Sequence, residues 1–453
     1  MTRIAVIDIG KTNAKLALVD GATLAEIDVV TRPNKVLPDP PWPHFDLDGH
    51  WDFFLTHLAD FHARHGIGAI SVTTHGASCV VLDRTGGLAA PMLDYEHPGP
   101  DDLAAEYDAL RPDFAQTGSP RLPMGLNVGA QLHWMLKTDP GLDARLAHVL
   151  TYPQYWGLRL TGELASDVTS LGCHTDLWNP WAGDVSALVD RLGLTGRIAP
   201  PRQPGERLGG LLPEIAARTG LPAGLPVAVG IHDSNASLYP YVLGRAAPFA
   251  VVSTGTWVIA MAMGAEDPVL DPARDVLVNV NAIGQPVPSA RFMGGREYEI
   301  VREGSEAVPS DTDRKAVLAA GAMLLPSVEH GSGPFPGRAA GWHHRPERPG
   351  EIMLALSWYL ALMTETCLNL IGARGPTIIE GPFARNPDYC AMLAALRAGG
   401  VEVAASATGT SVGAALLSLG QAAPPATRAV AVPDNAEALR AYAGRWRAAV
   451  NAA

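Results

Sequence analysis

The amino-acid sequence predicts an α/β protein with two domains. The chain has 453 residues and is 47% hydrophobic and 18% charged, so it can bury more than one core. Short apolar runs typical of strands alternate with segments of helical period. A strand–turn–strand pattern over 3–19 recurs at 249–264, which indicates a duplicated unit.

The first half is expected to contain two strand pairs. Residues 3–9 and 14–19 are predicted to form a hairpin around the turn at 10–13. "GAISVTTHGASCVVLDRTGG" (68–87) repeats the order of strand, polar turn and strand. Between these pairs, apolar residues at helical spacing predict a helix over 51–65 that packs on the sheet. Two shorter helices are expected at 126–137 and 154–160.

The second half begins after a stretch rich in proline and glycine. "GLPAGLPVAVGIHDSNASLYPY" (220–241) restarts a strand, so the domains are expected to be 1–228 and 229–453. Further elements are expected as a long apolar helix at 351–371, a strand at 377–380, a loop at 380–387 and a small-residue helix within 407–420.

Composition narrows the classes of function. A formal net charge of -12 argues against general nucleic-acid binding and against adsorption to an anionic membrane. No uninterrupted apolar run reaches the ~20 residues of a membrane span, and Asp8 interrupts the first apolar stretch, which argues against a signal peptide. Four widely spaced cysteines indicate buried thiols in a reducing compartment. We therefore expect a cytoplasmic protein.

The turn in "DIGKTNAK" (8–15) has two interpretations. Asn and Gly suit a plain surface hairpin. The same residues suit a phosphate cradle, in which backbone N–H groups and hydroxyls face an anion and Asp8 faces a metal ion. The turn alone does not decide between them.

Further motifs occur in a fixed order along the chain. "GLPAGLPVAVGIHDSNAS" (220–237) is a strand that ends in Gly-x-x-Asp, and "STGTW" (253–257) is a second small polar turn. "IIEGPFARNP" (378–387) and "GTSVGAALL" (409–417) follow. With "DIGKTNAK", this set resembles the FGGY carbohydrate kinases of the actin/hexokinase/Hsp70 ATPase superfamily. The resemblance covers essentially the whole chain. It implies two actin-like (ribonuclease H-like) domains with mixed sheets flanking a deep cleft.

The resemblance also implies an activity, the ATP-dependent phosphorylation of a sugar hydroxyl, with ATP and Mg²⁺ as cofactors. Such a reaction needs a proton acceptor, and the motif places this catalytic base at Asp233. Asp8 and Asp233 would hold the metal ion. The residues implied to bind the nucleotide are Gly10, Lys11, Thr12, Asn13, Lys15, Thr254, Gly255, Thr256, Gly381, Pro382, Phe383 and Asn386.

Sugar selection is implied to lie in the first domain, at "VTTHGASCVVLD" (72–83). Thr74 and Gly76 agree with the rhamnulokinase form, and "GIHDS" is similar to the His-Asp of rhamnulokinases and fuculokinases. The resemblance favours a ketose or deoxyketose such as L-rhamnulose, L-fuculose or a pentulose. The expected hydroxyl partners are His75, Gly76, Asp94, Glu96, Gln154, His232 and Asp233.

The chain departs from the family pattern in places. Its adenosine loop keeps only Gly381 of the usual adjacent glycines, and Gln131 stands where a lysine is usual before Leu-x-Trp. It is thus identified as a divergent member, and contacts to adenine are the least defined part of the expectation. The expected partners are a small-molecule sugar and ATP, with no nucleic acid and no membrane, and a homodimer is left open.

Alternatives stand beside these roles. Asp233 suits a helix N-cap, and Asp8 suits a hairpin-turn stabiliser. His75 suits a buried structural role, and Asp94 and Glu96 suit a solvated loop. Two other functions remain open: a non-catalytic sugar-binding regulator and a sugar-independent ATPase of the same superfamily.

Overall fold

The computed structural model describes residues 2–405, 409–420 and 425–452. The chain divides into two compact units. Unit 1 comprises Met1–Gly244, Val278–Pro286 and Thr408–Pro424, and unit 2 comprises Arg245–Leu277, Val287–Ala407 and Pro425–Ala453. The expected boundary at 228 falls inside unit 1, because the helix that begins at Asp233 packs on the sheet of that unit.

A mixed sheet forms the centre of unit 1. In the described residues its strand order is β13-β14-β6-β1-β2-β3, and β15 also pairs with β6. The central strand β1 is antiparallel to β2 and parallel to β6, which confirms the predicted hairpin. The strands are β1 (Arg3–Ile9), β2 (Asn13–Asp20), β3 (Glu26–Pro33), β6 (Ala69–Thr74), β13 (Arg207–Gly210), β14 (Pro226–Ala228) and β15 (Ile231–His232).

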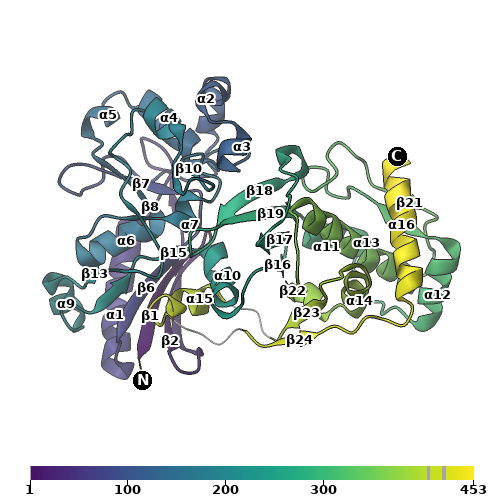
Figure 1. Cartoon of the computed structure of the whole chain (residues 1–453). Coiled ribbons are helices and arrows are strands. Elements are labelled where there is room, and N and C mark those ends of the chain that lie inside the picture. The colour runs from purple at the N-terminus through teal and green to yellow at the C-terminus, as the bar shows by residue number, and fades with distance from the viewer. Residues whose placement is uncertain (1, 406–408, 421–424, 453) are drawn as a thin grey trace. The chain divides into compact units, whose positions relative to one another are not determined.

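Helices cover both faces of this sheet (Figure 1). Because successive side chains of a strand point to opposite faces, Ala5 and Ile7 of β1 pack with α1 (Leu47–His65). The alternate residues Ile4 and Val6 pack with α10 (Asp233–Gly244) and α15 (Thr410–Leu416). β1 is therefore buried on both sides, and its carboxyl end is fixed.

In the second predicted strand pair, the second strand pairs with a different partner. The strands are present, but β7 (Cys79–Leu82) pairs with β8 (His148–Thr151) and not with β6. The prediction of a second hairpin at 68–87 is therefore wrong. The turn His75–Ser78 lets the chain leave the central sheet, so alternation alone could not reveal the partner strand.

The helices predicted in unit 1 are confirmed near their expected ends as α1, α4 (Val128–Thr138) and α6 (Tyr152–Thr161). Further helices described in this unit are α2 (Ala104–Leu110), α3 (Phe114–Thr117), α5 (Leu142–Arg145), α7 (Val168–Leu171), α8 (Ala187–Arg191), α9 (Pro213–Thr219) and the 3₁₀ turn η1 (Gly99–Leu103). Short strand pairs join them, formed by β4 (Val36–Leu37), β5 (His44–Phe45), β9 (Ser166–Asp167), β10 (Trp178–Asn179), β11 (Asp184–Val185) and β12 (Pro201–Arg202).

Unit 2 is built on a second mixed sheet. In the described residues the strand order is β18-β19-β17-β16-β22-β23-β24. The strands are β16 (Phe249–Thr254), β17 (Val258–Met263), β18 (Val276–Val280), β19 (Pro286–Phe292), β22 (Thr377–Glu380), β23 (Val401–Ala404) and β24 (Thr427–Ala429). The antiparallel β16–β17 pair and the parallel β16–β22 pair repeat the arrangement around β1, as the internal similarity predicted.

Helix α13 (Pro349–Leu370) is the core helix of unit 2. By length and composition it could span a membrane, but 83% of its most apolar window is buried inside the protein. The other elements of unit 2 are α11 (Gly294–Arg302), α12 (Asp311–Ala320), α14 (Pro387–Leu396), α16 (Ala436–Ala452), η2 (Pro272–Arg274), η3 (Pro382–Arg385), β20 (Met323–Leu325) and β21 (Gly341–His343).

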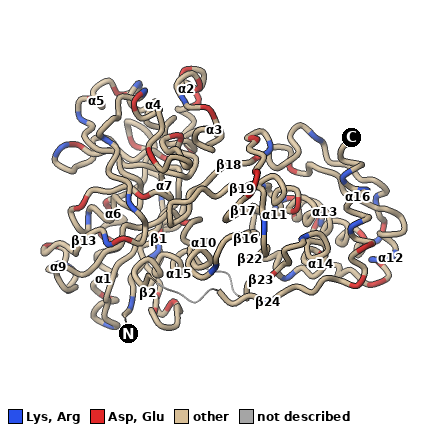
Figure 2. The backbone as a smooth tube through the Cα atoms, viewed as in Figure 1, with Lys and Arg blue, Asp and Glu red and all other residues tan. Residues whose placement is uncertain are grey.

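Acidic and basic residues lie among one another in both units (Figure 2). The four cysteines are all buried, as expected. With two sheet-containing units of strands and helices, the predicted α/β class is confirmed.

Candidate active site

Asp8 stands near the carboxyl end of β1 and is held from two directions. Its Oδ2 accepts hydrogen bonds from Thr410 Oγ1 (2.6 Å) and Ser411 Oγ (2.9 Å) at the start of α15. Lys15 Nζ lies 3.2 Å from the same oxygen and also pairs with Glu26. These contacts all use Oδ2, so Oδ1 accepts no hydrogen bond from the described residues. A fixed carboxylate with one open oxygen suits a metal ion or its water.

The turn after Asp8 is partly exposed. Gly10 N–H donates to Asn13 O at 2.9 Å, and the side chains of Thr12 and Asn13 are exposed. Lys11 does not extend into solvent with them. Its ammonium pairs with Asp94 and with Glu96 Oε2 (3.1 Å), and it lies 4.5 Å from the centre of the Tyr95 ring. Lys11 was expected to bind phosphate, but here it neutralises two carboxylates expected to bind sugar.

His75 follows β6 and is buried among aromatic rings. Phe45, Tyr95 and Tyr152 have ring centroids 5.2–5.3 Å from that of His75. Its Nδ1 lies 2.9 Å from Gly76 O, which assigns the proton to Nδ1. Nε2 is buried and has no hydrogen-bond partner among the described residues. Since burial lowers the pKa of His75, Nε2 is an acceptor that awaits a donor such as a sugar hydroxyl.

Gln154 has a structural role in this conformation. It is fully buried; its Oε1 accepts a hydrogen bond from Thr151, and its Nε2 donates to Val229 O at 2.9 Å. Both ends of the amide are therefore occupied by protein groups. The expectation that Gln154 contacts a sugar has no support in this geometry.

Asp233 begins α10 directly after β15. Nε2 of the preceding His232 lies 3.1 Å from Asp233 Oδ1. Ser234 N–H and Ser234 Oγ also donate to Oδ1, at 2.6 Å and 3.4 Å. Oδ2 accepts no hydrogen bond from the described part of the chain. One oxygen of Asp233 is thus fixed and the other is open, as for Asp8.

The surroundings of Asp233 favour a base that works near neutral pH. Although 29% of its side chain is exposed, burial of the carboxylate raises the pKa of Asp233 to about 6, and the negative charge of Asp8 adds to the rise. The electrostatic interaction with His75 and the hydrogen bond from Ser234 N–H lower the pKa of Asp233 but do not cancel this rise. Burial lowers the pKa of His232 to about 4, so His232 is neutral and donates from Nε2.

Gly76 leaves room for this pair. A Cβ at residue 76 would lie 2.7 Å from His232 Nε2. His232 is held further by Thr169, whose hydroxyl accepts from His232 N–H at 3.0 Å, and by Asn235 Nδ2, which is 3.4 Å from His232 Nδ1. Gly76 therefore acts through His232, since it lets the imidazole approach Asp233.

The side chains of Asp8 and Asp233 fit the expected Mg²⁺ ion. No group of three or more His, Cys, Asp or Glu that could hold a metal ion occurs among the described residues. Mg²⁺ keeps most of its waters and needs only one or two carboxylates. Asp8 and Asp233 each have an open oxygen, and the negative charge of Asp8 raises the pKa of Asp233. The two residues therefore fit as holders of a hydrated Mg²⁺.

Unit 2 contains a cavity of about 790 Å³ that is lined by five of the residues expected to bind the nucleotide. The expected residues that line it are Gly255, Thr256, Pro382, Phe383 and Asn386. One wall is aromatic, with the Phe383 ring 5.9 Å from the Tyr298 ring. Four arginines also line the cavity: Arg296, Arg302, Arg314 and Arg385. Three of them pair with carboxylates, Arg296 with Glu329, Arg302 with Glu299 and Arg314 with Asp388. The aromatic wall and the size of the cavity are therefore the features that suit a nucleotide.

Thr254 and Gly381 shape the cavity from behind. Thr254 is buried, and its hydroxyl donates to Glu380 O and accepts from Phe383 N–H at 3.1 Å. Gly381 has a φ of +83°, and a Cβ there would lie 2.0 Å from Thr254 O. The loop can pass so close to β16 only because residue 381 is glycine. Neither residue lines the cavity itself.

Asn386 has a structural contact as well as a place on the cavity. Its Oδ1 caps α14 by accepting from Asp388 N–H and Tyr389 N–H, both at 3.1 Å. Its Nδ2 donates to Ser357 Oγ at 2.9 Å. These bonds fix the loop 380–387 on α13 and α14.

Sequence reasoning missed one wall of the cavity. The segments from α11 and the loop that follows contribute Gly295, Arg296, Tyr298, Glu299, Arg302, Ser305, Glu306, Ala307, Val308 and Pro309. The signal was "GGREYE" (294–299), where two glycines begin a helix. Gly295 is needed there, since its Cβ would lie 2.1 Å from Gly255 O.

Comparison with known proteins identifies the family. Residues 3–239 match the N-terminal domain of the FGGY family of carbohydrate kinases, and residues 246–427 match the C-terminal domain of carbohydrate kinase FGGY. Over 280 residues the chain is 27% identical to L-fuculokinase of Escherichia coli strain K12, which covers 58% of this chain and 57% of the relative. The match therefore spans little more than half the length of that curated relative.

Solved structures agree in fold. A carbohydrate kinase from Novosphingobium aromaticivorans is 40% identical, with a TM-score of 0.90 over 98% of this chain and 100% of the other. The xylulose kinase from Rhodospirillum rubrum is 21% identical, with a TM-score of 0.77 over 99% of this chain and 98% of the other, so it supports the fold alone. The two family models match residues 3–239 and 246–427, which is well over half of the chain, and the chain therefore belongs to the FGGY family of carbohydrate kinases.

Proposed function

We propose that the protein transfers the γ-phosphoryl group of ATP to a hydroxyl of a ketose or deoxyketose, such as L-fuculose, L-rhamnulose or a pentulose. The observation that carries the proposal is Asp233: one carboxylate oxygen is fixed, the other is open, and its pKa is raised to about 6. Such a group is ionised at pH 7 and still basic enough to accept the proton of the attacking hydroxyl.

The sugar would bind in unit 1. His75 Nε2 is the acceptor without a partner, and Asp94 and Glu96 supply further acceptors when Lys11 balances their charge. Gly76 and His232 would orient the hydroxyl toward Asp233. The name of the curated relative, L-fuculokinase, supports the ketose class.

Residues of the expected phosphate and adenosine motifs would bind the nucleotide. In unit 2 the adenosine part would occupy the 790 Å³ cavity against Phe383, Pro382 and Asn386. Gly255 and Thr256, shaped by Thr254 and Gly381, would face the phosphates. In unit 1 the turn with Gly10, Thr12 and Asn13 would offer backbone and side-chain donors, while Lys15 holds Asp8.

Asp8 and Asp233 would hold Mg²⁺ through their open oxygens. When bound, the ion would neutralise charge on the phosphates and leave the chemistry of proton acceptance to Asp233. Lys15, Thr410 and Ser411 keep Asp8 in place for that role.

A coupled ADP-release assay across ketoses, aldoses and polyols tests the proposal. We expect ADP release to require one ketose or deoxyketose and to disappear in Asp233→Asn. ADP release at the same rate without any sugar would identify a sugar-independent ATPase. Binding of a sugar without turnover, checked by calorimetry, would identify a sugar-binding regulator.

A further inference from the structure

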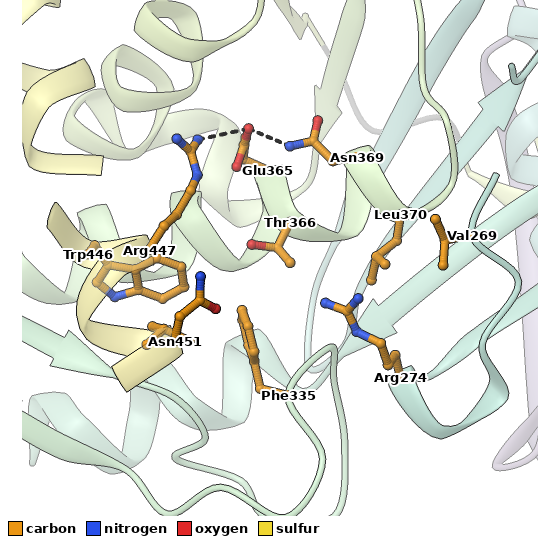
Figure 3. A pocket seen from close by; sticks show the side chains of 11 residues that line it. Val269, Arg274, Phe335, Glu365, Thr366, Asn369, Leu370, Trp446, Arg447 and Asn451 are labelled. Atoms are coloured by element: carbon orange, nitrogen blue, oxygen red, sulfur yellow. Dashed lines mark hydrogen bonds and ion pairs between the residues drawn. The ribbon is translucent and has the colours of Figure 1, made fainter. Parts of the chain in front are cut away.

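A second cavity, separate from the nucleotide cavity, lies in unit 2 between the last turns of α13 and α16 (Figure 3). Its volume is about 330 Å³, at the lower end of the range for small-molecule pockets. It shares no lining residue with the 790 Å³ cavity. The residues that form its walls are Val269, Arg274, Phe335, Glu365, Thr366, Asn369, Leu370, Trp446, Arg447, Val450 and Asn451.

One part of the cavity is apolar. Trp446 is buried, and its ring lies 5.8 Å from that of Phe335 in an edge-to-face arrangement. Leu370 and Val450 are buried beside it, while Val269 is 53% exposed. An exposed valine next to a set of buried apolar side chains gives a ligand further apolar surface to cover.

The positive and negative charges on the walls of this cavity do not cancel. Arg447 lies 3.0 Å from Glu365, which is 6% exposed and also accepts from Asn369 Nδ2 at 2.6 Å. Arg274 is oriented by its Nε, which donates to Pro334 O at 2.9 Å. Its two terminal nitrogens have no hydrogen-bond or ion-pair partner among the described residues. Two arginines and one glutamate leave one positive charge on the walls, and Arg274 carries it.

Polar groups converge on the same space. Figure 3 shows Arg274, Thr366 and Asn451 pointing into it from three elements. The Thr366 hydroxyl donates to Leu362 O at 2.8 Å, so it has no proton left for an anion, which must be held by the arginine. A guanidinium held by its Nε and open at its terminal nitrogens is arranged for bidentate binding of a carboxylate.

We propose that this cavity binds a small organic monocarboxylate with a compact apolar or aromatic body. The carboxylate would pair with Arg274, which balances the single unmatched charge. The body would lie against Phe335 and Trp446, with Val269 and Leu370 on the other side. A dianion would exceed the charge on the walls, and a sugar would leave the apolar surface unmatched.

Calorimetric titration of the full chain with benzoate tests this site without any kinase assay. Benzamide keeps the shape and removes the charge, and acetate keeps the charge and removes the body. We expect saturable one-to-one binding of benzoate, at least 10-fold tighter than binding of either control compound. Arg274→Met should weaken benzoate about 10- to 100-fold, the effect of losing a charged hydrogen bond.

The matched control is Arg374→Met, an arginine on the surface of unit 2 that lines neither cavity. Arg374 pairs with Glu266 at 2.7 Å and is 59% exposed, so its loss should leave benzoate binding unchanged. Val269→Trp changes an exposed side chain, and it should reduce binding by filling the mouth even if Arg274→Met does not fold. The proposal is overturned if benzoate shows no saturable binding, if benzamide or acetate binds equally well, or if neither Arg274→Met nor Val269→Trp weakens it.

Discussion

His232 Nε2 lies 3.1 Å from Asp233 Oδ1, and both residues sit where β15 passes into α10. Because burial keeps His232 neutral, this contact orients the carboxylate without adding a full positive charge beside it. Asp233 therefore keeps a raised pKa while one of its oxygens is held in place. The pair combines a fixed position with basicity, which a general base requires.

Replacing Asp233 with Asn tests the role of the carboxylate. Asn keeps the size and one acceptor but cannot take a proton, so turnover should fall roughly 10²–10⁴-fold. The affinity for sugar should change much less, as measured by calorimetry. Asn and Asp cap helices about equally well, so a purely structural role predicts a nearly normal rate. A well-folded variant with that rate would refute the assignment of the base.

The pH dependence of turnover gives a second test. Burial raises the pKa of Asp233 to about 6 from an ordinary value of 3.8, so the active ionised form is lost as pH falls below about 6. We expect kcat/KM for the sugar to drop tenfold per pH unit on the acid side. In Asp8→Asn the midpoint should move to lower pH, because the charge of Asp8 raises the pKa of Asp233. The midpoint, not the absolute rate, is the quantity compared, and a midpoint that stays in place would contradict this coupling.

Much of the fold could be predicted from the sequence because its signals are local. The alternation in β1 and β2 and the glycine-rich turns mark strand pairs directly, and the helical period of α1 marks its buried face. The strand Thr377–Glu380 has the predicted ends. The partner of β7 could not be predicted, since pairing depends on where the chain travels after His75.

The site was predictable only where one residue carries the chemistry. Asp8 and Asp233 stand at strand ends, a position visible in the sequence. The contacts that hold these carboxylates in place are not local in sequence. Thr410 and Ser411, which bond Asp8, are 402 and 403 positions further along the chain. Lys11 next to Gly10 resembles a phosphate ligand, and only the folded chain brings Asp94 and Glu96 to it.

Replacing Lys11 with Met separates its two roles. In the structure Lys11 neutralises Asp94 and Glu96, so its loss should leave two carboxylates in mutual repulsion on the sugar side. We expect KM for the sugar to rise roughly tenfold, the effect of losing one charged contact, and KM for ATP to change less than threefold. Lys15→Met, which disturbs Asp8 instead, is the comparison. If Lys11→Met raises KM for ATP and not for the sugar, Lys11 is a phosphate ligand as the family motif implies.

Replacing Gly381 with Ala tests how the adenosine loop is held. Residue 381 has φ +83° and ψ -161°, a region that costs a non-glycine residue about 1–3 kcal/mol. Its Cβ would also meet Thr254 O at 2.0 Å, so the loop must move away from β16. Thr254 Oγ1 would then lose the Phe383 N–H, and Phe383 would shift from the cavity wall. We expect a lower melting temperature and at least tenfold weaker ATP binding by calorimetry, since aromatic contact and shape are lost together.

The control for this change is Gly444→Ala in α16. Apart from its chain neighbours and the backbone of its own helix, no atom lies within 4 Å of a Cβ at residue 444. A glycine inside a helix costs about 0.5–1 kcal/mol relative to alanine. That variant should melt at the same temperature as the wild type or slightly higher, with unchanged ATP binding. If Gly381→Ala behaves like Gly444→Ala, the close approach of the loop to Thr254 does not shape the nucleotide cavity, and the glycine retained in this divergent motif needs another explanation. A loss of melting temperature with normal ATP affinity would separate the fold of the loop from its part in binding.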